Sequence, residues 1–78
     1  MNNNTIKLLD VVALTEDLPE RGLSRGQVGT VVEKLDGNAF LVEFNDDNGH
    51  TYAMLPLLTA QLIVLHYKPI DPQLIRNA

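Results

Sequence analysis

The chain has 78 residues, which is the size of one small domain. Six basic against ten acidic residues give a net charge of −4, and 45% of the residues are hydrophobic, so the composition is that of a globular protein. The chain contains no cysteine, which excludes disulfides, thiolate metal sites and a cysteine nucleophile.

The two ends of the chain do not predict export or membrane insertion. Residues 1–5 are rich in asparagine and lack the basic and apolar regions of a signal peptide, so we expect a disordered N-terminal arm. The longest apolar stretch, residues 52–65, is interrupted by Pro56 and falls short of the roughly 20 residues that span a bilayer. We therefore expect a soluble, cytoplasmic protein.

Short apolar runs separated by turn residues predict β-strands. The first strand is expected at residues 10–14, and the polar segment that follows, residues 15–25, contains Pro19 and therefore forms one helical turn at most. A second strand is expected at residues 28–35, where consecutive β-branched side chains fit a pleated surface. The sequence Asp-Gly-Asn follows it and is typical of a hairpin turn.

The remaining strands follow in quick succession. Alternation in residues 39–44 directs Phe40, Val42 and Phe44 toward the core and Glu43 away from it. A turn-rich linker of hairpin length then leads to the fourth strand.

The fourth strand is expected at residues 51–55, and Pro56 either ends it or confines it to an edge of the sheet, because proline cannot donate to the ladder. One 3₁₀ turn at residues 59–61 leads into a fifth strand at residues 62–65.

This order of elements predicts an all-β fold. We expect a small SH3-like, five-stranded half-open barrel over residues 6–66, with a long first loop, since such a barrel closes most of its edges. The alternative is an oligonucleotide-binding barrel, which usually carries a helix between its third and fourth strands. Residues 45–50 are too few to hold that helix.

The C-terminal residues 67–78 contain two prolines and are expected to form an extended, irregular tail. Three large apolar residues of this tail, Ile70, Leu74 and Ile75, must pack either on the barrel or on another chain. The second arrangement would make the protein a homo-oligomer.

Two stretches carry a family resemblance. The sequence GLSRGQVGTVVE at residues 22–33, paired with VEFNDDNGHTYA at residues 42–53, resembles domain-of-unknown-function family 4926, a family of small bacterial and often cyanobacterial proteins. The resemblance extends over about residues 6–65. It implies an SH3-like fold without an established activity. It also implies a role in a protein pair, as an antitoxin or immunity protein, because members are often met beside other small genes.

A shorter run, residues 26–31, is similar to the KOW module of ribosomal and transcription proteins, which implies nucleic-acid binding. A nucleic-acid groove needs clustered cations, because phosphate contacts provide most of the affinity. The six basic residues are scattered, and their one local cluster, Arg21 with Arg25, is flanked by acidic residues. We expect these charges to pair with one another within the loop.

The chain offers little chemistry for catalysis. Ser24 is the single serine and only His50 or His66 could act as its base, so we interpret Ser24 as a turn residue. The oxygen-rich run at residues 45–50 lacks the glycine and the glutamate that a calcium-binding EF-hand loop requires at its sixth and twelfth positions. We expect no enzymatic activity, no cofactor and no metal.

A protein partner is the remaining expectation. The long first loop and the hairpin before the fourth strand are the exposed, adaptable surfaces, and we expect Leu18 and Leu23 to be among their exposed residues. The candidate partner-binding residues are Glu16, Asp17, Glu20, Arg21, Asp46, Asp47 and His50. The acidic surface favours a basic partner. The sequence therefore predicts a non-enzymatic protein-interaction module, with a nucleic-acid-binding, KOW-like barrel as the alternative.

Overall fold

The computed structural model describes residues 5–66. Residues 1–4 of the expected N-terminal arm and the whole expected tail, residues 67–78, lie outside the described residues. The fold is all-β, as predicted, and its five antiparallel strands form one sheet in the order β4-β3-β2-β1-β5. The strands are β1 (Val11–Leu14), β2 (Val28–Lys34), β3 (Ala39–Asn45), β4 (Thr51–Leu58) and β5 (Leu62–Val64).

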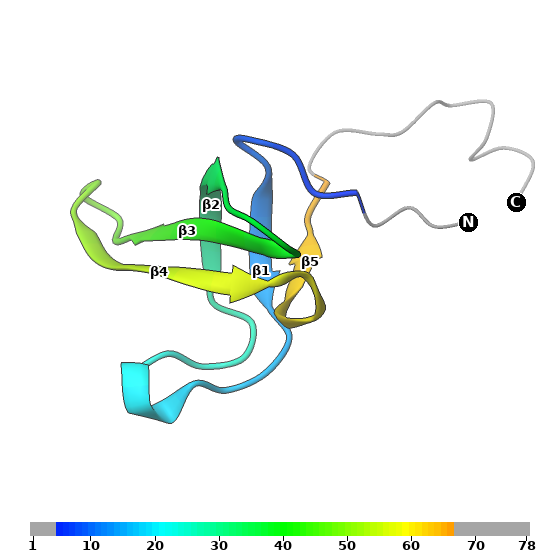
Figure 1. Ribbon diagram of the computed structural model, residues 1–78. Coiled ribbons are helices and arrows are strands. Elements are labelled where there is room, and N and C mark those ends of the chain that lie inside the picture. The colour runs from blue at the N-terminus through cyan, green and yellow to red at the C-terminus, as the bar shows by residue number, and fades with distance from the viewer. Residues whose placement is uncertain (1–4, 67–78) are drawn as a thin grey trace, which may run out of the picture.

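The sheet folds over on itself into two layers. Figure 1 shows β3 and β4 crossing in front of β1, β2 and β5. Strand β2 belongs to both layers, because it pairs with β1 through Val28 to Thr30 and with β3 through Thr30 to Lys34. Its register with β3 shifts between Val31 and Glu33, and such a bulge bends a strand. The result is the small half-open barrel of SH3-like type that the strand pattern predicts.

The core fills the space between the two layers. Its largest fully buried side chains are Phe44, Leu14, Val12, Val31 and Val42. The alternation predicted for β3 is confirmed, because Phe40, Val42 and Phe44 are buried whereas Leu41 and Glu43 are only half-buried on the opposite face. Every second residue of β3 thus packs against the other layer, which fixes the register of the strand.

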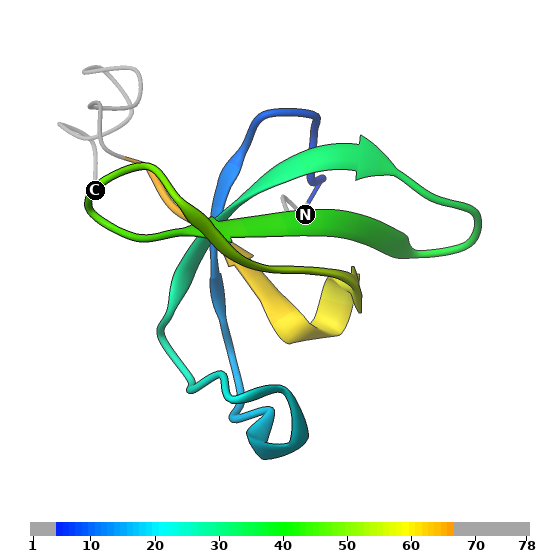
Figure 2. The same ribbon diagram turned by 90° about the vertical axis from the view of Figure 1, so that its left-hand side faces the viewer.

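Two single 3₁₀ turns complete the described fold. The turn η1 (Pro19–Arg21) lies in the long loop after β1, and η2 (Thr59–Gln61) joins β4 to β5, as predicted. Figure 2 shows the loop that contains η1 projecting from one end of the barrel. Between residues 5 and 66, no helix is long and apolar enough to cross a membrane.

Strand β4 continues through Pro56 to Leu58, three residues beyond its predicted end. Because β4 is an end strand of the sheet, the missing N–H of Pro56 can face the open edge. The register supports this arrangement. The Thr59 N–H donates to the Asn38 carbonyl (2.9 Å), so Thr59 and Asn38 form a hydrogen-bonded pair. Along an antiparallel ladder, such pairs alternate with pairs whose backbones share no hydrogen bond. Pro56, opposite Leu41, is then in a pair without ladder bonds. Of the two predicted effects of Pro56, confinement to an edge is therefore the correct one.

Candidate functional site

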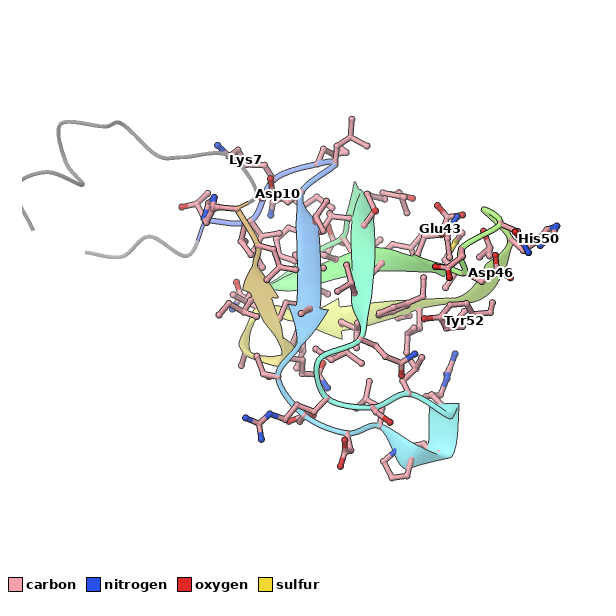
Figure 3. The ribbon with its side chains drawn as sticks, turned by 180° about the vertical axis from the view of Figure 1, so that it is seen from behind. Lys7, Asp10, Glu43, Asp46, His50 and Tyr52 are labelled. Atoms are coloured by element: carbon pink, nitrogen blue, oxygen red, sulfur yellow. The ribbon has the colours of Figure 1, made fainter. Side chains whose placement is uncertain are left out.

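The seven predicted partner-binding residues are all exposed, and they lie in two separate segments. Four of them are in the loop after β1, and three are in the hairpin between β3 and β4. Figure 3 shows Asp46 and His50 at the tip of this hairpin, close to Glu43 and Tyr52. None of the hydrogen bonds or ion pairs within residues 5–66 joins the four loop residues to the three hairpin residues.

The loop after β1 is anchored to the barrel rather than free. Leu18 and Leu23 are buried in the core cluster, so the expectation that they are exposed is wrong. Their backbones are joined in both directions: the Leu18 N–H donates to the Leu23 carbonyl (2.9 Å) and the Leu23 N–H donates to the Leu18 carbonyl (3.1 Å). This pairing closes the loop around η1 and directs both leucine side chains inward.

The charges of the loop do not pair with one another as expected. The Asp17 carboxylate accepts a hydrogen bond from the backbone N–H of Arg25 (2.8 Å), and the Glu16 carboxylate accepts one from the Gln61 side-chain amide (3.0 Å). No ion pair joins side chains of this loop within the described part of the chain. The prediction of self-pairing is wrong because the backbone and a neighbouring amide satisfy these two carboxylates. Glu20 and Arg21 remain exposed on η1.

Asp46 organises the hairpin between β3 and β4. One of its carboxylate oxygens accepts hydrogen bonds from the backbone N–H groups of Asn48 and His50, each at 2.9 Å. Its other oxygen lies 3.6 Å from Nδ1 of His50, whose side chain is 78% exposed. Asp46 therefore acts mainly as a turn-forming residue. Among residues 5–66, no three His, Asp or Glu side chains gather closely enough to hold a metal ion.

The outer face of β4 is a surface that the sequence predictions missed. From Ala53 onward its side chains alternate, with Ala53, Leu55 and Leu57 facing the core and three apolar residues facing outward. These three residues, which we call the β4 outer row, are Met54, Pro56 and Leu58. All three are exposed, Met54 to 46% and Leu58 to 55%. Figure 1 views the molecule from the side of β3 and β4.

The sequence does contain a signal for this surface. A strand with one solvated face normally alternates apolar and polar residues, whereas a continuous apolar run is typical of a strand covered on both faces. Residues 52–58 read YAMLPLL and contain no charged residue. A run of this kind on an end strand leaves apolar side chains on the outward face as well as on the inward face.

Tyr52 lies beside one end of the β4 outer row, at the position where the register between β3 and β4 shifts, and it is held in place there. Its hydroxyl accepts a hydrogen bond from the Gln27 side-chain amide (3.0 Å), and its ring centroid lies 6.3 Å from that of Phe44. The side-chain oxygen of Gln27 in turn accepts from the Ser24 N–H, which ties Tyr52 to the end of the long loop. A ring fixed in this way has little conformational freedom.

A shallow hollow of about 320 Å³ lies beside β5 and η2. Ile6, Leu62, Ile63 and Val64 form its apolar lining, and two threonines and an alanine complete it. No ionisable side chain lines this hollow. Ser24 lies in the long loop, whereas Asp46 and His50 lie in the hairpin, so the possible catalytic residues are distributed over two segments.

Comparison with known proteins gives one match. The family model described as "Domain of unknown function (DUF4926)" matches residues 8–64, which cover β1 to β5 completely. No curated protein and no solved structure matches the chain.

Proposed function

The chain belongs to the DUF4926 family, and from this premise we propose that it is a non-enzymatic protein-interaction module whose contact surface is the β4 outer row. The observation that carries the proposal is the exposure of three successive outward-facing apolar residues, Met54, Pro56 and Leu58, on an end strand. Contiguous exposed apolar patches mark interaction sites in soluble proteins. A role as a complex subunit or as an antitoxin or immunity partner agrees with this surface.

The residue types in the row and beside it support protein recognition. Aromatic residues and methionine are enriched at the centres of protein interfaces, and tyrosine is common among the residues that dominate binding energy. Tyr52 is already oriented by Gln27 and Phe44, and Met54 can adapt its flexible side chain to a partner.

The charges beside the row define the chemistry of the partner. Glu43 lies opposite Met54 on β3, where it accepts a hydrogen bond from the Thr51 hydroxyl, and Asp46 and Asp47 follow in the adjoining hairpin. The hairpin end of the row is therefore acidic. A partner that presents apolar side chains flanked by lysine or arginine would match both features. The predicted residues Asp46 and Asp47 then contribute at the rim, where charge affects the association rate more than the affinity.

The proposal that the chain is not an enzyme draws on the placement of its few reactive groups. The single serine and the Asp46–His50 pair come from different segments, and His50 extends into solvent rather than into a cleft. Nucleophilic catalysis needs the nucleophile and its base within hydrogen-bonding distance, together with donors for the developing charge.

A co-expression experiment tests the proposed surface. Tagged wild-type chain and its Met54→Asp variant are expressed in the native host together with the proteins of the neighbouring genes, and the bound fraction is measured after purification. Leu8→Asp is the matched control, because Leu8 is exposed to a similar extent but lies in the turn between Lys7 and Asp10, on the opposite side of Figure 3 from Tyr52.

We expect the wild type and Leu8→Asp to retain a partner, and Met54→Asp to lose at least tenfold in affinity, which corresponds to about 1.4 kcal/mol. Urea unfolding of all three proteins shows whether each variant is folded. Equal retention of the partner by Met54→Asp, or no partner for the wild type, would contradict the proposal. Binding of labelled RNA or DNA at micromolar protein, weakened by salt, would favour the nucleic-acid alternative instead.

A further inference from the structure

Each end strand of the sheet has one open edge, and the ladder fixes which backbone groups face it. On β4, Pro56 lies in a pair without ladder bonds, and so do the residues two positions before and after it, because the two kinds of pair alternate. The backbone nitrogens of Met54, Pro56 and Leu58 therefore point away from β3, toward the open edge. Unpaired groups on such an edge are a template for the addition of another strand.

Two of these three nitrogens cannot donate to an added strand. Pro56 has no N–H. The Leu58 N–H already donates to the side-chain oxygen of Gln61 (2.8 Å). Between residues 5 and 66, no hydrogen bond outside the ladders uses the Met54 N–H. An added strand would bond to every second residue of β4, so between residues 54 and 58 it would find one donor out of three.

Gln61 is held in position at the end of η2. Its side-chain amide donates to the Glu16 carboxylate (3.0 Å), and its backbone carbonyl accepts from the Thr15 N–H (3.0 Å). The Thr15 hydroxyl also donates to the Ala60 carbonyl (3.0 Å). These bonds attach η2 to the start of the long loop, so the Gln61 oxygen stays directed at the Leu58 N–H.

The turn η2 also engages the open edge of β5, and Figure 1 shows this turn between the end of β4 and β5. The Leu65 N–H donates to the Val11 carbonyl (2.8 Å), so by alternation the N–H groups of Val64 and Leu62 face the open edge. The Leu62 N–H donates to the Thr59 carbonyl at the start of η2. Because β5 is only three residues long, it is a poor template for a further strand.

We propose that Pro56 and Gln61 close the open edge of β4 to strands of other chains. Met54, Pro56 and Leu58 supply both the side chains of the β4 outer row and the backbone groups of this edge. An apolar strand with an open edge is a site of aggregation, and closure lets the row stay exposed without edge-to-edge pairing. A partner at the row is then held by side-chain contacts. This consequence rests on the proposed function, whereas closure of the edge does not.

Amide hydrogen exchange of the full-length chain, followed by NMR, tests the bond between Leu58 and Gln61. We expect the Leu58 amide to be protected and the Met54 amide to exchange rapidly, although both face the open edge. Gln61→Met keeps the length of the side chain and removes the acceptor. In this variant the Leu58 amide should exchange at least about tenfold faster, which corresponds to about 1.4 kcal/mol.

The Leu57 amide is the internal control for this measurement, because by alternation it bonds to β3. Its exchange should be the same in the wild type and in Gln61→Met. Rapid exchange of Leu58 in the wild type, or an equal rate for Leu58 in the two proteins, would overturn the proposal.

Light scattering over a range of protein concentrations tests the closure itself. Pro56→Val supplies the missing donor, and Gln61→Met frees the Leu58 N–H. We expect the double variant to self-associate at least about tenfold more strongly than the wild type, because two further backbone hydrogen bonds can form between chains. Pro56→Val alone is the matched control, since it adds the same apolar side chain while the Leu58 donor stays engaged, and it should associate less.

Hydrogen exchange of the associated double variant locates the contact, because the Met54 and Leu58 amides should become protected. Urea unfolding shows whether each variant is folded. Association no stronger than that of the wild type, or association that leaves both amides unprotected, would overturn the proposal. Because the purified chain alone is used, these outcomes are separate from that of the co-expression experiment.

Discussion

Gly29 on β2 lies against Val42 on β3 so closely that a Cβ atom at position 29 would be 2.7 Å from Cγ1 of Val42. The same atom would be 2.9 Å from the backbone carbonyl oxygen of Glu43. Only glycine allows the two strands to approach in this way. Gly26, three residues earlier, has a φ of +91°, which also favours glycine. Both glycines of the KOW-like run therefore meet needs of the barrel, and the run alone gives no reason to infer nucleic-acid binding.

Gly29→Ala should destabilise the protein. The neighbouring backbone cannot move as a flexible side chain can, and overpacking of a core typically costs about 1–3 kcal/mol. Urea unfolding measures the loss. Thr30→Ala is the control at the adjacent half-buried position, where the β-propensity scale spans only about 1 kcal/mol. Equal stability of Gly29→Ala and the wild type would contradict the close approach.

Phe44→Ala should be among the most damaging core substitutions. The side chain is fully buried, and removal of a buried phenylalanine costs about 3–5 kcal/mol through lost burial and the cavity left behind. Glu43→Ala is the matched substitution on the opposite face, where loss of the hydrogen bond from Thr51 should cost at most about 1.5 kcal/mol. Similar losses of melting temperature for the two variants would mean that the register of β3 is wrong.

Asp46→Ala should weaken the hairpin between β3 and β4. Its carboxylate accepts two backbone hydrogen bonds, and loss of a comparable side-chain cap at a helix end costs about 0.5–2 kcal/mol. Asp47→Ala removes an equal charge from an exposed neighbour and should change stability by less than about 0.5 kcal/mol. Thermal unfolding of the two variants at the same pH separates the loss of the turn from the loss of charge.

Leu9→Asn should stabilise the protein. Leu9 has a φ of +71° in a turn closed by the hydrogen bond from the Asp10 N–H to the Lys7 carbonyl (3.0 Å), and it is 73% exposed. A left-handed conformation costs a residue other than glycine or asparagine about 1–2 kcal/mol, whereas little burial is lost here. We expect a gain of up to about 1 kcal/mol in urea unfolding. Leu8→Asn, at the adjacent position without a positive φ, should bring no gain.

Local patterns were sufficient to predict the strands. Alternation identified the inward residues of β3, and the turn sequences separated the strands to within a few residues. Pro56 was harder to interpret, because its effect depends on whether β4 is a central or an end strand. That position follows from long-range pairing, which a single proline cannot reveal.

The site was less predictable than the fold. Leu18 and Leu23 were grouped with the exposed loop because polar residues surround them, yet their mutual backbone pairing directs both into the core. Asp17 and Asp46 are predicted partner-binding residues, and Asp17 is also expected to pair with the basic residues of its loop, although each carboxylate accepts hydrogen bonds from backbone N–H groups. Side-chain to backbone bonds of this kind join residues that local sequence patterns do not relate. The β4 outer row was missed because the sequence analysis assigned no inward and outward residues to the fourth strand and expected it to end at residue 55.

The sheet order β4-β3-β2-β1-β5 has a consequence for the way in which the chain acquires its structure during synthesis. Strands β2, β3 and β4 form a meander of neighbouring hairpins, so they can pair soon after they emerge from the ribosome. Strand β1 is completed on its second side only by β5, whose residues are translated almost 50 positions after it. A nascent chain stalled before residue 62 would therefore expose the backbone of its first strand to chaperones or to neighbouring chains.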